Sequence, residues 1–211
     1  MIIFDISLTI SNDLPIWPGD PELHLQRISD VNNGDYATLS RLECCVHLGT
    51  HIDAPVHFVR GGTGIDSLDL HTLIGPCCVI HLPNVDVITA DALRAAPIPP
   101  GTTRLLCRSR NSIWWERGDN QFHTDFVGID VSGAEWLVAQ GIRLIGVDYL
   151  SVAPYNESAP VHEVLLGAGV IPVEGLNLAG IEAGQYQLVC LPLKILDCDG
   201  APARAVLIRT E

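Results

Sequence analysis

Four side chains of the kinds that bind metal ions fall within eleven consecutive residues: His47, His51, Asp53 and His57. Divalent metals of the zinc and manganese type take neutral imidazole nitrogen and carboxylate oxygen as ligands. Burying several imidazoles and a carboxylate together is costly unless a metal or full hydrogen bonding compensates. The run therefore predicts a metal site rather than a set of unrelated polar residues.

The spacing of these residues predicts how they face the metal. His51 and Asp53 are two residues apart, so an extended chain points both side chains the same way. His47 also falls on that side of an extended segment, and the Gly-Thr pair before His51 disfavours a helix. Pro55 is expected to stiffen the path that directs His57 back toward the site. We therefore expect a strand that enters a loop.

Other catalytic motifs are missing from the sequence. The run is not the H-E-x-x-H motif of metalloproteases, because Leu48 stands where the general-base Glu would be. No G-x-S-x-G motif predicts a serine hydrolase, and neither G-x-G-x-x-G nor a P-loop predicts a nucleotide site. These absences leave chemistry supplied by a bound metal as the leading hypothesis, and we expect that chemistry to be hydrolysis.

Further ligands must come from elsewhere in the chain, because a catalytic metal normally has at least three protein ligands and an open position. His162 lies one turn into a helix that Ser158 can cap. Glu174 follows an apolar strand, where a carboxylate can face a site. The remaining histidines are isolated from other potential ligands, and we expect them to be structural: His24, His71, His81 and His123.

Composition limits the class of protein and its partners. The 211 residues, 47% of them hydrophobic, suit one domain over residues 1–211 with a sizeable core. A formal charge of -13 argues against nucleic acid or an anionic membrane as a partner. No signal peptide and no long apolar segment is present, so we expect a cytoplasmic protein. The seven cysteines are expected to be buried free thiols.

Strand-like segments outnumber helix-like ones and do not alternate strictly with them, so we expect an α/β fold with a mixed sheet rather than a doubly wound parallel one. Predicted helices are a short one over Asp66–Leu73, one over Ala90–Ala96 capped by Thr89, one opened by a capping box at Ser132 and Glu135 and closed by Gly141, and one over Ala159–Leu166. Predicted strands are Ile2–Ile10, Ala37–Val46, Cys77–His81, Arg104–Cys107, Leu144–Val147, Gly169–Pro172, Tyr186–Lys194 and Ala203–Arg209.

The run His47–His57 resembles the H-x-G-T-H-x-D-x-P-x-H signature of the Putative cyclase family, which includes bacterial kynurenine formamidases and isatin hydrolases. The resemblance covers nearly the whole chain. The outer segments that carry it are Asp5–Leu8, Pro15–Asp20 with its W-P-G-D, Gly146–Ser151 with its G-x-D-x-x-S, and Pro160–His162 followed by Glu174.

This resemblance implies a fold, a cofactor and an assembly. The implied fold is a mixed β-sheet sandwich with a few helices, of the swivelling β/β/α type, assembled as a homodimer or homotetramer. Kynurenine formamidases of the family carry two zinc ions, whereas isatin hydrolases use manganese. The implied ligands are His47, His51, Asp53, His162 and Glu174, with Asp53 bridging the metals if two are present.

The resemblance also implies roles for two further residues. His57 would transfer protons, and its ordinary pKa near 6.5 suits that duty. Trp17 could stack on an aromatic substrate, or it could simply pack within its loop. We therefore expect a metal-dependent amide hydrolase, zinc being the first choice of metal, that converts N-formylkynurenine to kynurenine and formate.

Three alternatives stay open on the sequence alone. The first is an enzyme of the isatin-hydrolase type that opens a cyclic amide with manganese. The second is a non-catalytic metal-binding domain, which a closed four-ligand site would favour. The third is a cyclase, as the family name suggests, although hydrolysis explains the metal more simply.

Overall fold

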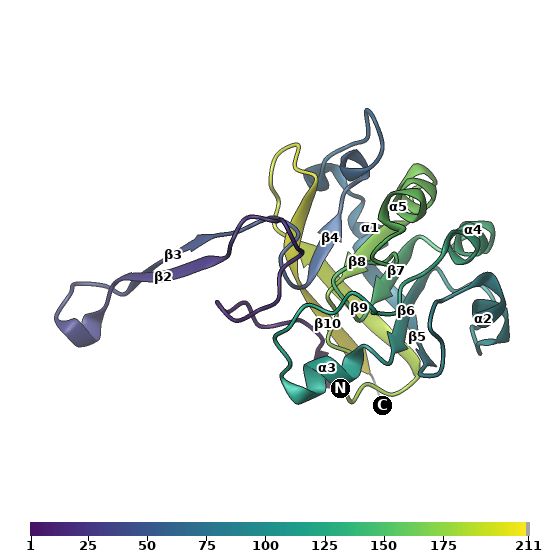
Figure 1. The fold of residues 1–211 in the computed structure, drawn as a ribbon, viewed down its shortest axis with the longest axis horizontal. Coiled ribbons are helices and arrows are strands. Elements are labelled where there is room, and N and C mark those ends of the chain that lie inside the picture. Colours follow the sequence, from purple (N-terminus) through teal and green to yellow (C-terminus); the bar gives the residue numbers. More distant parts are fainter. Residues whose placement is uncertain (210–211) are drawn as a thin grey trace.

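The computed structural model describes residues 1–209 (Figure 1). Strands and helices alternate irregularly along the chain. The strands are β1 (Ile2–Asp5), β2 (His24–Ser29), β3 (Leu39–Glu43), β4 (His51–Asp53), β5 (Ile74–Leu82), β6 (Arg104–Ser109), β7 (Leu144–Val147), β8 (Ile171–Glu174), β9 (Gly184–Pro192) and β10 (Gly200–Arg209). The α-helices are α1 (Leu70–Leu73), α2 (Ala90–Ala95), α3 (Ser112–Arg117), α4 (Val131–Ala139) and α5 (Ser158–Gly167).

The main sheet closes on itself. Its eight strands follow the order β1-β10-β4-β8-β7-β6-β5-β9, and β9 also pairs with β10. Because β1 lies outside this ring, the other seven strands form a closed barrel. Neighbours from β5 to β8 are parallel, whereas all other pairs in the sheet are antiparallel. The expected α/β class and mixed sheet are confirmed, but the swivelling sandwich is not, since one sheet wraps around the core.

Two apolar cores lie on opposite sides of the barrel wall. Successive residues of a strand point to opposite faces, and β5 shows this clearly. Cys77 and Val79 belong to the core enclosed by the barrel, whereas Cys78 and Ile80 belong to the core beneath the helices. Helices α2, α4 and α5 cover this outer face in a row (Figure 1).

Strands β2 and β3 pair only with each other and extend away from the barrel as an arm (Figure 1). All five residues of β3 are exposed. The predicted strand Ala37–Val46 is therefore present in part, but it does not enter the core as its apolar composition suggested. β2 carries polar residues between its apolar ones and was not predicted at all.

Most other predicted elements are confirmed, with shifted ends. The helix after Thr89 begins as expected, since the Thr89 hydroxyl accepts from the amide of Ala92 at 3.1 Å. The predicted capping box at Ser132 is wrong, because Asp130 caps α4 by accepting from the amide of Gly133 at 2.8 Å. Ser158 was expected to cap α5, but it is the first residue of that helix and makes no cap hydrogen bond. Helix α3 was not predicted. The short helix predicted over Asp66–Leu73 is split into a 3-10 turn and α1.

The cysteines are all free thiols, as expected. Four are buried, but Cys44, Cys45 and Cys198 are only half-buried, so burial was overestimated for these three. Within residues 1–209, none of the helices has the length and apolar character needed to span a bilayer.

Candidate metal centre

Strand β4 is the short element on which the site is built. The strands on either side of β4 in the sheet, β8 and β10, bring in residues that are far away in the sequence. His51 pairs with Glu174 on β8, and Asp53 pairs with Gly200 on β10. His51 and Asp53 lie two residues apart on the strand, and each has only 1% of its side chain exposed. The expectation that both point the same way is confirmed by the 3.5 Å between His51 Nε2 and Asp53 Oδ1.

His47 and His57 flank this strand without belonging to it. His47 lies in a turn before β4, so the prediction of one extended segment from His47 to Asp53 is wrong. The 3-10 turn Pro55–His57 follows the strand, with Pro55 at its first position. This turn brings the His57 ring back over His47, with the ring centroids 4.0 Å apart and the planes 26° apart. The expected effect of Pro55 on the path of His57 is thus present.

Helix α5 contributes His162 from its inner face. The Nε2 atom of His162 lies 3.0 Å from Glu174 Oε1 and 3.4 Å from Asp53 Oδ2. Glu174 also faces His51, whose Nε2 is 3.2 Å from its other oxygen. The structure therefore brings the five residues expected to bind metal into one largely buried group, to which strands β4 and β8, a turn and helix α5 contribute.

Hydrogen bonds outside the group fix how its histidines present their ring nitrogens. His51 Nδ1 donates to the carbonyl of Gly49 at 2.9 Å, and His162 Nδ1 donates to the carbonyl of Ser158 at 2.7 Å. A ring whose Nδ1 carries the proton keeps the Nε2 lone pair for a metal. In both residues Nε2 is the atom that faces the carboxylates of Asp53 and Glu174.

The group fits a divalent metal. Asp53 Oδ2 is the one buried side-chain nitrogen or oxygen among residues 1–209 that has no hydrogen-bond partner. Two carboxylates, Asp53 and Glu174, are buried beside each other, which is costly without a cation. Two sets of potential ligand atoms share Asp53, namely His47, His51 and Asp53, and Asp53, His162 and Glu174. The second set lies on the side of the unpartnered Oδ2 atom.

Contacts within the group shift the pKa values of its histidines and carboxylates. Burial favours neutral rings, but hydrogen bonds to carboxylates outweigh it and raise the pKa of His47 to about 9 and that of His162 to about 10. Burial opposes ionisation of Asp53 as well, yet the adjacent rings of His162 and His47 keep its pKa well below the usual value. Burial lowers the pKa of His57, which has no comparably close carboxylate.

A cavity of about 260 Å³ opens onto this group. Its apolar lining residues include Ile16, Trp17, Phe58 and Leu150. Polar residues line it too, including His57 and His162. No lysine or arginine lines the cavity within the described part of the chain. The cavity is therefore suited to a small, largely apolar molecule.

Trp17 lines this cavity and also packs against other aromatic rings. Its ring is 5.3 Å from that of Phe122 and 5.3 Å from that of Tyr155, measured between centroids. Both roles considered for Trp17, loop packing and a surface for a substrate ring, are compatible with this position.

The isolated histidines lie outside the centre, as expected. None of His24, His71, His81 and His123 belongs to a group of potential metal ligands among residues 1–209.

The structure adds residues that the sequence did not single out. Asp199 Oδ2 lies 2.9 Å from His47 Nε2, although 152 residues separate the two in the chain. Asp20 and Ser151 line the cavity; both lie in segments that carry the family resemblance, but neither was given a role. The motif residue Asp148 is instead structural, because it accepts hydrogen bonds from Ser109 and Ser112.

A closed mixed barrel with a buried His/Asp/Glu centre at the base of an open cavity defines a class, that of metal-dependent hydrolases. Residues 4–154 match the Putative cyclase family, and the chain belongs to that family. It is 39% identical to Cyclase-like protein 1 of Arabidopsis thaliana, over 98% of this chain and 85% of that protein. It is 38% identical to the kynurenine formamidase of Geobacillus thermodenitrificans, over 96% of this chain and 95% of that enzyme.

Solved structures show the same fold. A structure described as a potential metal-dependent hydrolase with cyclase activity superposes with a TM-score of 0.85 at 34% identity, covering 100% of this chain and 99% of that one. Isatin hydrolase A from Ralstonia solanacearum superposes with a TM-score of 0.82, covering 99% and 92% of the chains. At 23% identity this second likeness shows the fold alone.

Proposed function

We propose that this protein hydrolyses a carbon–nitrogen bond of an N-formyl aryl amide, with N-formylkynurenine as substrate and kynurenine and formate as products. The observation that carries the proposal is the buried centre around Asp53 at the base of an apolar cavity. The similarity to a kynurenine formamidase over nearly the full length of both chains supports the choice of substrate. We expect a cytoplasmic enzyme that forms a homodimer or homotetramer.

His47, His51, Asp53, His162 and Glu174 would hold the metal, zinc being the first choice and manganese the alternative. A bound divalent cation lowers the pKa of a water molecule and polarises a carbonyl oxygen. Because Asp53 belongs to both sets of ligand atoms, it would help to hold each ion if two are bound. Asp53→Ala should therefore remove both metal and activity, and undiminished hydrolysis by this variant would contradict the assignment.

The chain's own groups would orient the substrate and move protons. Trp17 would stack on the aromatic ring, an interaction worth about 0.5–1.5 kcal/mol beyond the burial. His57 lines the cavity and is stacked on His47, and this position next to the candidate metal ligands supports a role in proton transfer. It would accept a proton from the attacking water or donate one to the departing aniline nitrogen.

Opening of a cyclic amide remains a second candidate, and one feature of the cavity favours it. N-formylkynurenine carries a carboxylate, but neither lysine nor arginine lines the cavity in the described residues. Isatin is neutral and needs no such partner. A non-catalytic metal-binding domain is a weaker candidate. A structural metal site is normally closed by four protein ligands, whereas here a cavity opens onto the candidate ligands and His57 lines it.

A substrate panel under defined metals tests these proposals. The protein would be stripped of metal, reloaded with zinc or manganese, and its metal content measured. Each form would then be given N-formylkynurenine and isatin. We expect formate release from N-formylkynurenine with zinc. Turnover of isatin alone would favour the second candidate, and bound metal without turnover of either compound would contradict the proposed function.

A further inference from the structure

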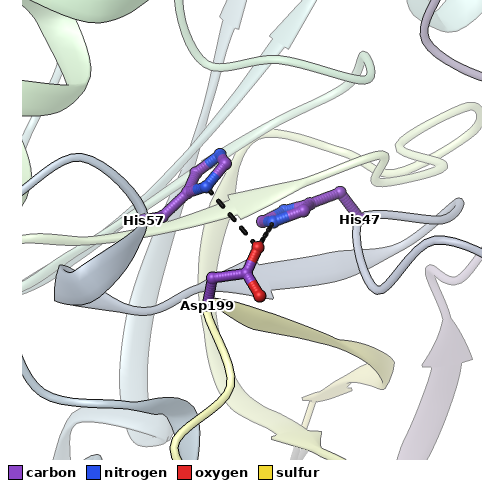
Figure 2. Close-up of side chains that lie close together, drawn as sticks. All are labelled: His47, His57 and Asp199. Carbon is purple, nitrogen blue, oxygen red and sulfur yellow. Dashed lines mark hydrogen bonds and ion pairs between the residues drawn. The ribbon is translucent and has the colours of Figure 1, made fainter. Parts of the chain in front are cut away.

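A half-buried cluster joins the metal centre to the residue expected to transfer protons. It consists of His47, His57 and Asp199, and Figure 2 shows one carboxylate oxygen of Asp199 directed toward a ring nitrogen of each histidine. Asp199 Oδ2 lies 2.9 Å from His47 Nε2 and 3.7 Å from His57 Nδ1. Asp199 does not line the cavity, so it would act through these rings rather than on the substrate.

The His47 ring lies between two carboxylates. Its Nδ1 atom is 2.9 Å from Asp53 Oδ1, and its Nε2 atom is 2.9 Å from Asp199 Oδ2. A neutral ring carries one proton, so the acceptor on one nitrogen decides which nitrogen keeps the lone pair. A proton on Nε2, donated to Asp199, leaves the Nδ1 lone pair on the side of Asp53 and the metal centre.

The other two histidines of the centre follow the same rule. Each donates from its outward nitrogen, His51 to the carbonyl of Gly49 and His162 to that of Ser158. His47 differs in that its outward nitrogen faces a charged carboxylate. Hydrogen bonds of this kind to a metal-binding histidine fix its tautomer and ring orientation and make the ring a stronger ligand.

The backbone holds Asp199 in place. Its carbonyl accepts from the amide of Ala54 at 2.8 Å, directly beyond the pairing of Asp53 with Gly200. Gly200 leaves room for the ring, because a Cβ atom there would lie 2.7 Å from His47 Cε1. The start of β10 is therefore shaped around His47.

We propose that Asp199 is a positioning residue, which holds the tautomer and ring plane of His47 and, through the stacked rings, the position of His57. This inference rests on the proposed function in that it takes His47 to be a metal ligand. Asp199 thus adds the loop before β10 to the segments that organise the centre.

Asp199→Asn tests this role, and Asp197→Asn is its matched control. Asp197 lies in the same loop but is exposed, and its side chain has no contact with the histidines. Zinc affinity would be measured by competition with a chromophoric chelator. Imidazole ¹⁵N–¹H correlation spectra of the zinc-loaded protein would show which nitrogen of His47 carries a proton, and kcat and KM would be measured with N-formylkynurenine.

We expect Asp199→Asn to weaken zinc binding by about 10- to 100-fold, to remove or weaken the His47 Nε2–H signal, and to lower kcat more than KM. Asp197→Asn should match the parent protein in all three. Asp199→Ala provides a second variant, and thermal unfolding of each confirms that it is folded. Equal zinc affinity and an unchanged His47 signal in Asp199→Asn would overturn the inference.

Two other results separate this inference from the proposed function. If the parent protein binds zinc but hydrolyses neither compound, the proposed function fails, while zinc affinity and the His47 signal still report on Asp199. Two results together would show that Asp199 is instead a ligand: Asp199→Asn loses one equivalent of zinc, and His47 Nε2 of the zinc-loaded parent protein binds metal instead of a proton. That outcome would overturn the positioning role.

Discussion

At the scale of single residues, the centre depends on which atom each side chain presents. His51 and His162 both direct Nε2 inward because backbone carbonyls hold Nδ1. Asp53 presents one oxygen to His47 and keeps the other without a hydrogen-bond partner. When no metal is bound, protons on the His47 and His162 rings offset the negative charges of the carboxylates. A cation has to displace these protons in order to bind.

This competition predicts how zinc affinity depends on pH. The pKa of His47 is raised to about 9 and that of His162 to about 10, so both rings are protonated at neutral pH when no metal is bound. Zinc has to displace these protons, and its apparent affinity should rise about tenfold per pH unit for each proton displaced. The carboxylates are already ionised and add nothing to this slope.

Chelator competition between about pH 6 and pH 8 would measure the slope, and calorimetry in buffers of different ionisation enthalpy would count the released protons. We expect the release of about two protons. An affinity that does not change with pH would show that neither ring is protonated in the metal-free protein.

His57→Ala is expected to separate metal binding from catalysis. His57 belongs to the outer cluster with Asp199 and lines the cavity, whereas the buried sets around Asp53 do not include it. The variant should keep its zinc and lose about 10²- to 10⁴-fold in kcat, the usual contribution of a proton-transferring group. Metal analysis and steady-state kinetics measure the two quantities.

His71→Ala is the matched control for this experiment, because His71 is exposed on α1 and lies in no ligand group. It should change neither quantity. A His57→Ala protein that has lost its metal would instead make His57 a ligand.

The sequence revealed the residues of the centre unequally. His47, His51, Asp53 and His57 were predictable because they fall within eleven residues, where their density alone points to a metal. His162 and Glu174 are separated from this run by about half the chain, and family resemblance strengthened their assignment. Asp199 is one of 25 acidic residues and is far in the sequence from the histidines of the centre, so only the pairing of β10 with β4 brings it to the site.

At the scale of elements, the centre depends on the close approach of two chain segments beside β4. Gly175 follows Glu174 and has a φ of 65°, in the left-handed region. A Cβ atom at this position would overlap the carbonyl of Gly49, the same group that accepts the His51 Nδ1 proton. The spacing of the two segments therefore also fixes the orientation of His51.

Gly175→Ala should consequently affect both stability and metal binding. The backbone conformation alone costs an alanine about 1–2 kcal/mol, and the collision with the Gly49 carbonyl adds to that cost. Gly169→Ala separates these effects, because Gly169 has a φ of 76° but nothing within 4 Å of an added Cβ. Denaturant unfolding of the metal-free variants and zinc titration provide the measurements.

We expect Gly169→Ala to lose stability while keeping the zinc affinity of the parent protein. Gly175→Ala should be less stable than Gly169→Ala and should also bind zinc more weakly. Equal effects of the two substitutions would mean that the close approach at Gly49 does not constrain the centre.

The elements that could be predicted are those with a strong local signal. Buried strands such as β7 are continuous apolar runs, and Thr89 marks the start of α2. β3 was predicted as a strand, but local composition could not show that it stays exposed, because that depends on the pairing of β2 and β3 with each other alone. Closure of the barrel likewise depends on contacts between β9 and β10 that no local pattern encodes.

At the scale of the whole molecule, the arm formed by β2 and β3 is not stabilised by pairing with the barrel strands. Leu25 and Leu42 face each other across the two strands, and they are 41% and 49% exposed. An isolated two-stranded hairpin is marginally stable in water. The arm therefore fits the expected homodimer or homotetramer, in which a second copy of the chain would cover these side chains.

Leu42→Asp tests whether the arm contributes to assembly. Burying a leucine side chain stabilises an interface by about 1.5–3 kcal/mol, and a buried unpaired carboxylate would oppose it further. We expect the variant to shift toward monomer in light scattering coupled to size-exclusion chromatography, measured over a range of protein concentrations.

Leu196→Asp is the matched control. Leu196 is 79% exposed in the loop before β10, and its substitution should leave the assembly unchanged. If both variants keep the parent protein's mass, Leu42 is not essential to the interface; a parent protein that is already monomeric would contradict the expected homodimer or homotetramer itself.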